Sequence, residues 1–189
     1  MRVIAGTHKG RKLQVASGRV TRPTSDKIKE SLFNQIGPFF RGGMCLDLYA
    51  GSGALGIEAI SRGMEACVFI DKNHYAIKMV KKNIEQLKLE NHAYVYRSEA
   101  TSMLPILHSK KQQFQLIFLD PPYDKADLTG IIRDILKYQL LADDGVICCE
   151  HDVSQQLPTT IDPLTIMKHK KYGSTTGMTI YKNNQKMEA

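Results

Sequence analysis

From residue 44 onwards, short apolar runs alternate with longer amphipathic segments. The apolar runs have the length and near-continuous hydrophobicity of strands that are buried on both faces of a sheet. We expect strands at 44–49, 66–71, 93–97, 114–120 and 145–150. The clearest helix, at 73–88, carries one apolar stripe with lysines on its other side. This alternation predicts an α/β fold in which helices cover both faces of a parallel sheet.

The two ends of the chain depart from this alternation. Segments 165–170 and 178–182, on either side of a turn at Gly173, predict an antiparallel hairpin that closes the sheet. Near the start, Arg2–Ala5 and Lys12–Val15 predict a small β-hairpin with basic residues in and around its loop.

A helix is expected directly after this first hairpin. The turn R-P-T-S-D at 22–26 offers N-cap candidates and places Asp26 in the first helical turn. An apolar face follows, and the helix stops near Gly37. Residues 1–43 are therefore predicted to form a small amino-terminal appendage, and residues 44–189 the main domain.

The turn after the first strand of the main domain has the spacing G-x-G-x-x-G at Gly51, Gly53 and Gly56. Between a strand and a helix, such a turn lets backbone N–H groups approach a ligand closely. An acid about 20 residues further on can hold ribose hydroxyls, and Asp71 stands at that place. This spacing predicts a nucleotide-like cofactor, either NAD or S-adenosylmethionine (AdoMet).

Two further acids bear on the choice of cofactor. Asp47 stands just before the glycines, where a carboxylate would repel the pyrophosphate of NAD. The same carboxylate suits AdoMet, whose methionine part carries an ammonium and whose sulfonium is also cationic. Glu99 follows the third strand, where AdoMet enzymes commonly place an acid beside the adenine. An ordinary acid at a helix start is the structural alternative for Glu99.

The fourth strand runs into D-P-P-Y at 120–123. Because proline cannot donate to a sheet ladder, the strand must stop there. In an open parallel sheet this strand ends at the switch point where ligands bind. We expect the Asp120 carboxylate and the Pro121 carbonyl to accept the two hydrogens of an exocyclic base amine, with Tyr123 as a stacking face. A stiff turn is the structural alternative.

The net charge of +7 is concentrated at the amino end. Residues 1–43 hold nine Lys and Arg against two acids, whereas the remaining residues hold 17 of each sign. Such asymmetry favours a nucleic acid as partner, although a solvated basic tail is the alternative. The candidates for phosphate contacts are Lys9, Arg11, Lys12, Arg19 and Arg22.

Composition narrows the protein class further. No apolar stretch reaches the roughly 18–20 residues that span a bilayer, and the start lacks the apolar core of a signal peptide. The four cysteines have no C-x-x-C spacing, and the six histidines show no ligand or triad spacing. We expect buried thiols in a reducing cytoplasm, no metal and a monomer.

Four motifs run almost from end to end of the chain: R-V-I-A-G-x-x-K-G-R-K-L, R-P-T-S-D-K-I-K-E-S-L-F-N, C-L-D-L-Y-A-G-S-G-A-L-G-I-E-A-I-S-R-G and F-L-D-P-P-Y. With them the sequence resembles the bacterial 16S rRNA (guanine-N2)-methyltransferases of the small-subunit rRNA methyltransferase D family. The basic hairpin with R-P-T-x-D is the more specific part of the resemblance. The family more often has glycine at Ala5 and arginine at Lys9.

The resemblance implies a Rossmann-like, seven-stranded AdoMet-dependent methyltransferase sheet with helices on both faces. It implies 16S rRNA of the assembling small subunit as substrate, with 1–43 as RNA-binding appendage and 44–189 as catalytic domain. The implied AdoMet contacts are Asp47, Gly51, Gly53, Asp71 and Glu99. The residues implied to present the guanine amine are Asp120, Pro121 and Tyr123.

Three alternatives stay open at this point. A DNA or RNA adenine-N6 methyltransferase is the nearest, because D-P-P-Y fits either amine. An NAD-dependent oxidoreductase would leave D-P-P-Y and the basic amino end unexplained. A non-catalytic RNA-binding assembly factor would leave both D-P-P-Y and Asp47 unexplained.

Overall fold

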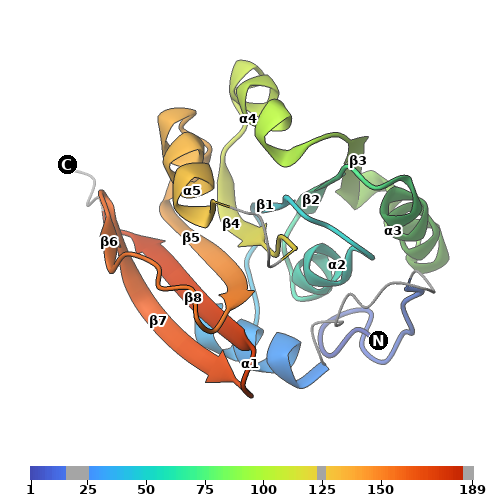
Figure 1. The fold of residues 1–189 in the computed structure, drawn as a ribbon. Coiled ribbons are helices and arrows are strands. Elements are labelled where there is room, and N and C mark those ends of the chain that lie inside the picture. The colour runs from blue at the N-terminus through green and yellow to red at the C-terminus, as the bar shows by residue number, and fades with distance from the viewer. Residues whose placement is uncertain (16–25, 123–126, 185–189) are drawn as a thin grey trace. The chain divides into compact units, whose positions relative to one another are not determined.

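The protein consists mainly of strands that alternate along the chain with helices, and Figure 1 shows these elements as a ribbon. The computed structural model describes residues 1–15, 26–122 and 127–184. By its internal contacts the chain divides into two compact units, Met1–Ala100 and Thr101–Ala189.

The first unit contains a parallel sheet with the strand order β3-β2-β1. Its elements are α1 (Asp26–Ile36), β1 (Met44–Asp47), α2 (Ala54–Ser61), β2 (Ala66–Asp71), α3 (His74–Leu87), the 3-10 turn η1 (Glu90–His92) and β3 (Ala93–Arg97). The register pairs Met44 with Ala66 and Cys67 with Ala93. The chain thus winds outward from β1, and the carboxyl ends of the three strands share one edge.

The second unit contains a mixed sheet with the strand order β4-β5-β8-β7-β6. Its elements are α4 (Ala100–Ser109), which begins at the boundary, β4 (Phe114–Leu119), α5 (Leu128–Lys137), β5 (Leu141–Asp152), β6 (Thr160–Ile161), β7 (Leu164–Tyr172) and β8 (Thr176–Asn183). The β4–β5 pair is parallel and the other pairs are antiparallel. The predicted closing hairpin is β7–β8.

The predicted α/β fold class is confirmed, with differences at element ends. β1 stops at Asp47, earlier than expected, because the next residues enter the glycine turn. β5 is longer than predicted because it pairs on both sides: Leu141 lies opposite Phe114, and Asp152 lies opposite Thr176. The two-residue strand β6 is too short for a periodic signal and was not predicted.

The helix α3 shows why periodicity worked for the long elements. Its apolar stripe, Ile77, Val80, Ile84 and Leu87, is buried, and burying each such side chain contributes about 1.5–3 kcal/mol. The Asn73 side chain accepts a hydrogen bond from the Tyr75 N–H, capping the helix start.

The amino-terminal arm, defined here as residues 1–15, is less regular than the predicted hairpin. Its two halves share one antiparallel bridge, between Arg2 and Lys12. The backbone between them turns instead towards α2, where the N–H groups of Ile4 and Ala5 donate to the Glu58 carboxylate. The arm therefore packs as part of the first unit, while its predicted role as a separate appendage stays a prediction.

The four cysteines are buried free thiols, as the sequence indicated. Burial raises the pKa of Cys67, Cys148 and Cys149, so these thiols stay protonated. Within the described ranges, none of the helices is long and apolar enough to cross a membrane.

Candidate active site

The glycine turn joins β1 to α2 in a conformation that side chains other than glycine rarely adopt. Gly51 and Gly53 have positive φ angles of 56° and 79°, and Gly53 is the N-cap of α2. Gly56 serves another purpose, because a Cβ there would overlap the ring of Phe69 on β2. The three glycines thus shape the turn and press α2 against the sheet.

Asp71 ends β2 and holds the glycine turn directly. Its Oδ2 accepts a hydrogen bond from the Gly51 N–H at 2.9 Å, and its Oδ1 accepts one from the Asn73 N–H at 2.8 Å. The side chain is only half-buried. Two residues predicted to serve one cofactor, 20 positions apart, are therefore in contact.

Asp47 lies on the inner side of the same turn. It is 1% exposed, and its Oδ2 accepts a hydrogen bond from the Gly56 N–H at 3.2 Å. Burial, together with the nearby Asp71 charge, raises the pKa of Asp47 to about 7. A cation beside Asp47 would therefore stabilise a carboxylate that is only partly ionised near neutral pH.

Glu99 lies just beyond β3, close to residues from the other two strand ends. Its carboxylate pairs with the Lys72 ammonium at 3.3 Å, and both side chains are largely exposed. Burial, with a further contribution from the Glu99 charge, raises the pKa of Tyr49 to about 12. The carboxyl ends of β1, β2 and β3 thus carry Asp47, Asp71 and Glu99.

The D-P-P-Y corner begins where the sequence placed it. β4 ends at Leu119, Asp120 follows half-buried, and Pro121 is buried. Both belong to the second unit. Tyr123 lies outside the described residues.

A buried charge cluster under the arm was missed by the sequence analysis. Glu58 on α2 pairs with the Lys29 ammonium of α1 at 3.2 Å and with the Arg62 guanidinium at 2.7 Å. Its two oxygens also accept the arm's backbone N–H groups from Ile4 and Ala5, at 2.8 and 3.0 Å. One carboxylate therefore fixes the arm to two helices, and Lys29 adds a hydrogen bond to the carbonyl of Arg2.

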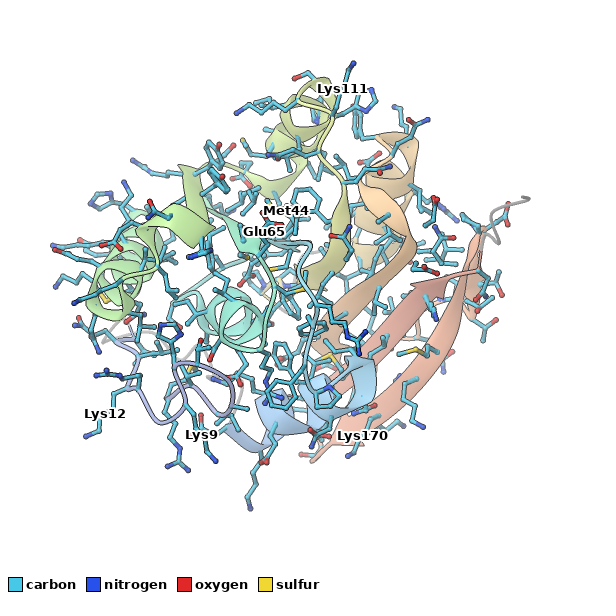
Figure 2. All side chains as sticks on the ribbon, turned by 180° about the vertical axis from the view of Figure 1, so that it is seen from behind. Lys9, Lys12, Met44, Glu65, Lys111 and Lys170 are labelled. Atoms are coloured by element: carbon cyan, nitrogen blue, oxygen red, sulfur yellow. The ribbon has the colours of Figure 1, made fainter. Side chains whose placement is uncertain are left out.

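Three basic side chains of the arm are exposed to solvent, where they can contact a partner. Lys9, Arg11 and Lys12 are exposed, and Figure 2 shows Lys9 and Lys12 directed away from the ribbon. Arg19 and Arg22 lie outside the described residues. The arm thus presents cations outward while its backbone is held from beneath.

A second missed residue, Asn83 on α3, touches both the arm and the glycine turn. Its side chain exchanges two hydrogen bonds with the backbone of Gln14, and it donates a third to the Ser52 carbonyl. Asn83 is fully buried on the apolar stripe between Val80 and Ile84. A polar residue on such a stripe is a signal that the sequence does contain.

The sequence profile of one protein family, described as Conserved hypothetical protein 95, matches residues 1–182. The chain belongs to the Conserved hypothetical protein 95 family. The resemblance noted in the sequence is confirmed, because relatives that match most of the chain are named as rRNA methyltransferases. The Bacillus subtilis (strain 168) protein named "Putative rRNA methyltransferase YlbH" is 50% identical over 96% of this chain and 98% of its own length.

Further similar proteins carry methyltransferase names. The "Ribosomal RNA small subunit methyltransferase D" of Escherichia coli (strain K12) is 35% identical over 92% of this chain and 85% of its own. The solved structure of "Putative methyltransferase yhhF" from Escherichia coli has a TM-score of 0.84 and 33% identity, covering 98% of this chain and 99% of that one. The fold is therefore the Rossmann-like methyltransferase fold.

The donor set of the site suits an organic cofactor. Across the described part of the chain, no cluster of three or more His, Cys, Asp or Glu side chains could hold a metal ion. The groups at the strand ends of the first unit are the carboxylates of Asp47, Asp71 and Glu99, which suit the ammonium and the hydroxyl groups of AdoMet.

Proposed function

We propose that this protein transfers a methyl group from AdoMet to the exocyclic N2 amine of a guanine in 16S rRNA, in the bacterial cytoplasm. One observation carries the proposal: the glycine turn lies between two carboxylates. Asp47 accepts from Gly56 and Asp71 accepts from Gly51. Such a turn suits a cationic ligand with hydroxyl groups and disfavours a pyrophosphate.

The three acids at the strand ends of the first unit would each have a part in holding the cofactor. Asp47 would pair with the ammonium group, and Asp71 would accept from the ribose hydroxyls. The backbone of the glycine turn would lie close to the ligand, since Gly51 and Gly53 carry no side chain. Glu99 would lie beside the adenine, with Lys72 already bonded to it.

AdoMet, when bound, supplies a methyl group activated by a positively charged sulfur. The amine lone pair would form the new N–C bond, and the electron pair of the C–S bond would stay on sulfur. A base amine is a weak nucleophile because its lone pair is delocalised into the ring. The Asp120 carboxylate and the Pro121 carbonyl would accept the two amine hydrogens and aim the lone pair, and Asp120 or water would take the released proton.

Most of the rate would come from this positioning. Holding two reactants in line can lower a barrier by roughly 7–11 kcal/mol. The double proline fixes the Pro121 carbonyl before the base arrives, and Tyr123 would stack on the base, an interaction worth about 1–3 kcal/mol. The strand β4 that carries this corner is buried and apolar, so it is a rigid support.

The arm would bind the RNA. Its exposed cations, Lys9, Arg11 and Lys12, would contact phosphates, with Arg19 and Arg22 extending the same basic segment. Such contacts set affinity and register without reading the base. The named rRNA methyltransferases among the relatives support RNA as the polymer.

The nearest rival is an adenine-N6 methyltransferase, because Asp120 and Pro121 could orient either amine.

The test of the proposed function combines cofactor binding and methyl transfer. Calorimetric titration with AdoMet and with NAD should show binding of AdoMet alone. Labelled AdoMet should then transfer its methyl group to small-subunit particles or 16S rRNA and not to DNA. Binding of NAD, or transfer to DNA in preference to rRNA, would overturn the proposal.

A further inference from the structure

The Asn83 side chain bonds both the arm and the glycine turn. Its Oδ1 accepts a hydrogen bond from the Gln14 N–H at 2.7 Å. Its Nδ2 donates to the Gln14 carbonyl and to the Ser52 carbonyl, each at 2.9 Å. Gln14 lies two residues after Lys12, and Ser52 lies between the two positive-φ glycines.

The burial of this amide needs an explanation. Asn83 is 0% exposed, on a stripe where its neighbours Val80 and Ile84 are apolar core residues. An amide at such a position is costly unless its hydrogen bonds are made. Here both of its polar atoms are used, and every bond goes to a segment outside α3. The side chain therefore connects two segments and is not needed to form its own helix.

We propose that Asn83 is a positioning residue that couples RNA binding by the arm to cofactor binding by the glycine turn. This inference rests on the proposed function, which assigns RNA to the arm and AdoMet to the turn. Fixing the Ser52 carbonyl by a bound cofactor also fixes Asn83, and Asn83 fixes the backbone of Gln14. The segment that carries Lys12 is then already ordered when RNA arrives, so each ligand strengthens the binding of the other.

Gln86 provides a matched control on the same helix. Its Nε2 donates to the Lys12 carbonyl at 3.0 Å, so it too joins the arm to α3. It lies close to one turn beyond Asn83, and its side chain bonds to Lys12 and Gln14 of the arm. Removing Gln86 loosens the arm from α3 but leaves the bond between Asn83 and Ser52 in place.

The experiment measures the affinity for labelled small-subunit particles with and without saturating S-adenosylhomocysteine, which cannot donate a methyl group. In the unsubstituted protein the compound should tighten particle binding about fivefold or more, the lower end of typical coupling. Asn83→Leu should bring this ratio close to one, and Gln86→Ala should keep it. An unchanged ratio in Asn83→Leu would overturn the inference.

Two further readouts keep the outcome clear. Absence of S-adenosylhomocysteine binding to the unsubstituted protein contradicts the proposed function, whereas binding with a ratio of one contradicts only the coupling. Should Asn83→Leu fail to fold, hydrogen exchange in the unsubstituted protein decides. Saturating S-adenosylhomocysteine should slow exchange of the Gln14 amide, which bonds to Asn83, and unchanged exchange there refutes the coupling.

Discussion

The Asp71 carboxylate at the end of β2 accepts a hydrogen bond from the Gly51 N–H at 2.9 Å. This bond ties the second strand's terminal acid to the turn that follows the first strand. The acid that is proposed to hold the ribose therefore also sets the shape of the turn. Substitution of Asp71 should therefore reduce the affinity for the cofactor more than it reduces the stability of the fold.

Asp71→Ala should weaken AdoMet binding by roughly 1.5–3 kcal/mol, the range for a hydrogen bond to a charged group. Calorimetric titration measures this change directly. Glu65→Ala is a suitable control, because Glu65 is an exposed acid at the opposite end of β2. An Asp71→Ala protein with undiminished AdoMet affinity would place the ribose partner elsewhere.

Asp47 predicts a pH dependence of cofactor binding. Burial raises the pKa of Asp47 to about 7, so the ligand-free protein keeps this proton at pH values where an unfolded chain has lost it. The protonated Asp47 carboxyl therefore contributes to the free energy of unfolding below about pH 4, and this contribution is lost as pH rises through about 7. A bound ammonium favours the ionised carboxylate, so AdoMet affinity should rise over the upper part of that window.

Titration between about pH 5.5 and 7 checks this expectation, with a limiting slope of about one decade per pH unit for one proton. Binding at pH 6 should also release protons, which is visible as a dependence of the binding heat on the buffer. Asp47→Asn should remove both effects while it weakens binding. A flat profile in the unsubstituted protein would show that Asp47 does not meet the ammonium.

The cluster around Glu58 predicts a large effect on stability. Glu58→Ala leaves Lys29 buried without its carboxylate and takes the acceptor from the N–H groups of Ile4 and Ala5. The free energy of unfolding should fall by about 3–5 kcal/mol, as for other broken buried ion pairs. Urea denaturation is the measurement.

The exposed ion pair between Arg2 and Asp26, at 3.4 Å, is the matched control. Because both partners are open to water, Arg2→Ala should cost less than about 1 kcal/mol. Equal effects of Glu58→Ala and Arg2→Ala would mean that burial does not govern the strength of the cluster.

The arm predicts a salt-dependent contribution to RNA affinity. Changing Lys9, Arg11 or Lys12 to Ala should weaken particle binding and lower the slope of log affinity against log salt by about 1. AdoMet affinity should stay constant, since all three side chains are exposed and Figure 2 shows Lys9 and Lys12 directed away from the ribbon. Single substitutions suit this test better than truncation, because Val3 and Leu13 of the arm are buried.

Binding measured at several salt concentrations would settle this point. Substitution of Lys111, an exposed lysine of the second unit, serves as a control for general charge effects. If Lys9→Ala and Lys111→Ala reduce the slope equally, the charge of the arm has no special part in RNA binding.

Spacing along the sequence was enough to predict the pieces of the site that follow strand ends. That Asp47, Gly51, Asp71 and Glu99 lie near one another could be predicted, because a parallel sheet gathers consecutive strand ends at one edge; their contacts with a cofactor stay a prediction. The end of β4 directly before Asp120 and Pro121 could be predicted because proline cannot continue a strand.

Lys29, Glu58 and Asn83 could not be assigned in the same way. Periodicity shows that the polar residues Lys29 and Asn83 fall on apolar helix faces, where polar residues are unusual. Periodicity does not show which residues they bond to. Those partners lie 27 to 69 residues away along the chain, and only the packing of α1, α2, α3 and the arm brings them together. The hairpin was overestimated for the same reason, since its backbone bonds to α2.

Asp120 is proposed to position the guanine amine for methylation. A folded Asp120→Ala protein should lose nearly all turnover but bind AdoMet almost normally, because the proposed contact of Asp120 is with the target base. The Pro121 carbonyl remains in that variant, so the base still has one acceptor. Turnover close to that of the unsubstituted protein would remove Asp120 from the reaction.

The most direct measurement identifies the product. Small-subunit particles from cells that lack the gene are incubated with AdoMet and the purified protein, digested to nucleosides and analysed by mass spectrometry. N2-methylguanosine should form with the unsubstituted protein and should be absent with Asp120→Ala. N6-methyladenosine, or no new methylated nucleoside from a protein that binds AdoMet, would contradict the proposed function.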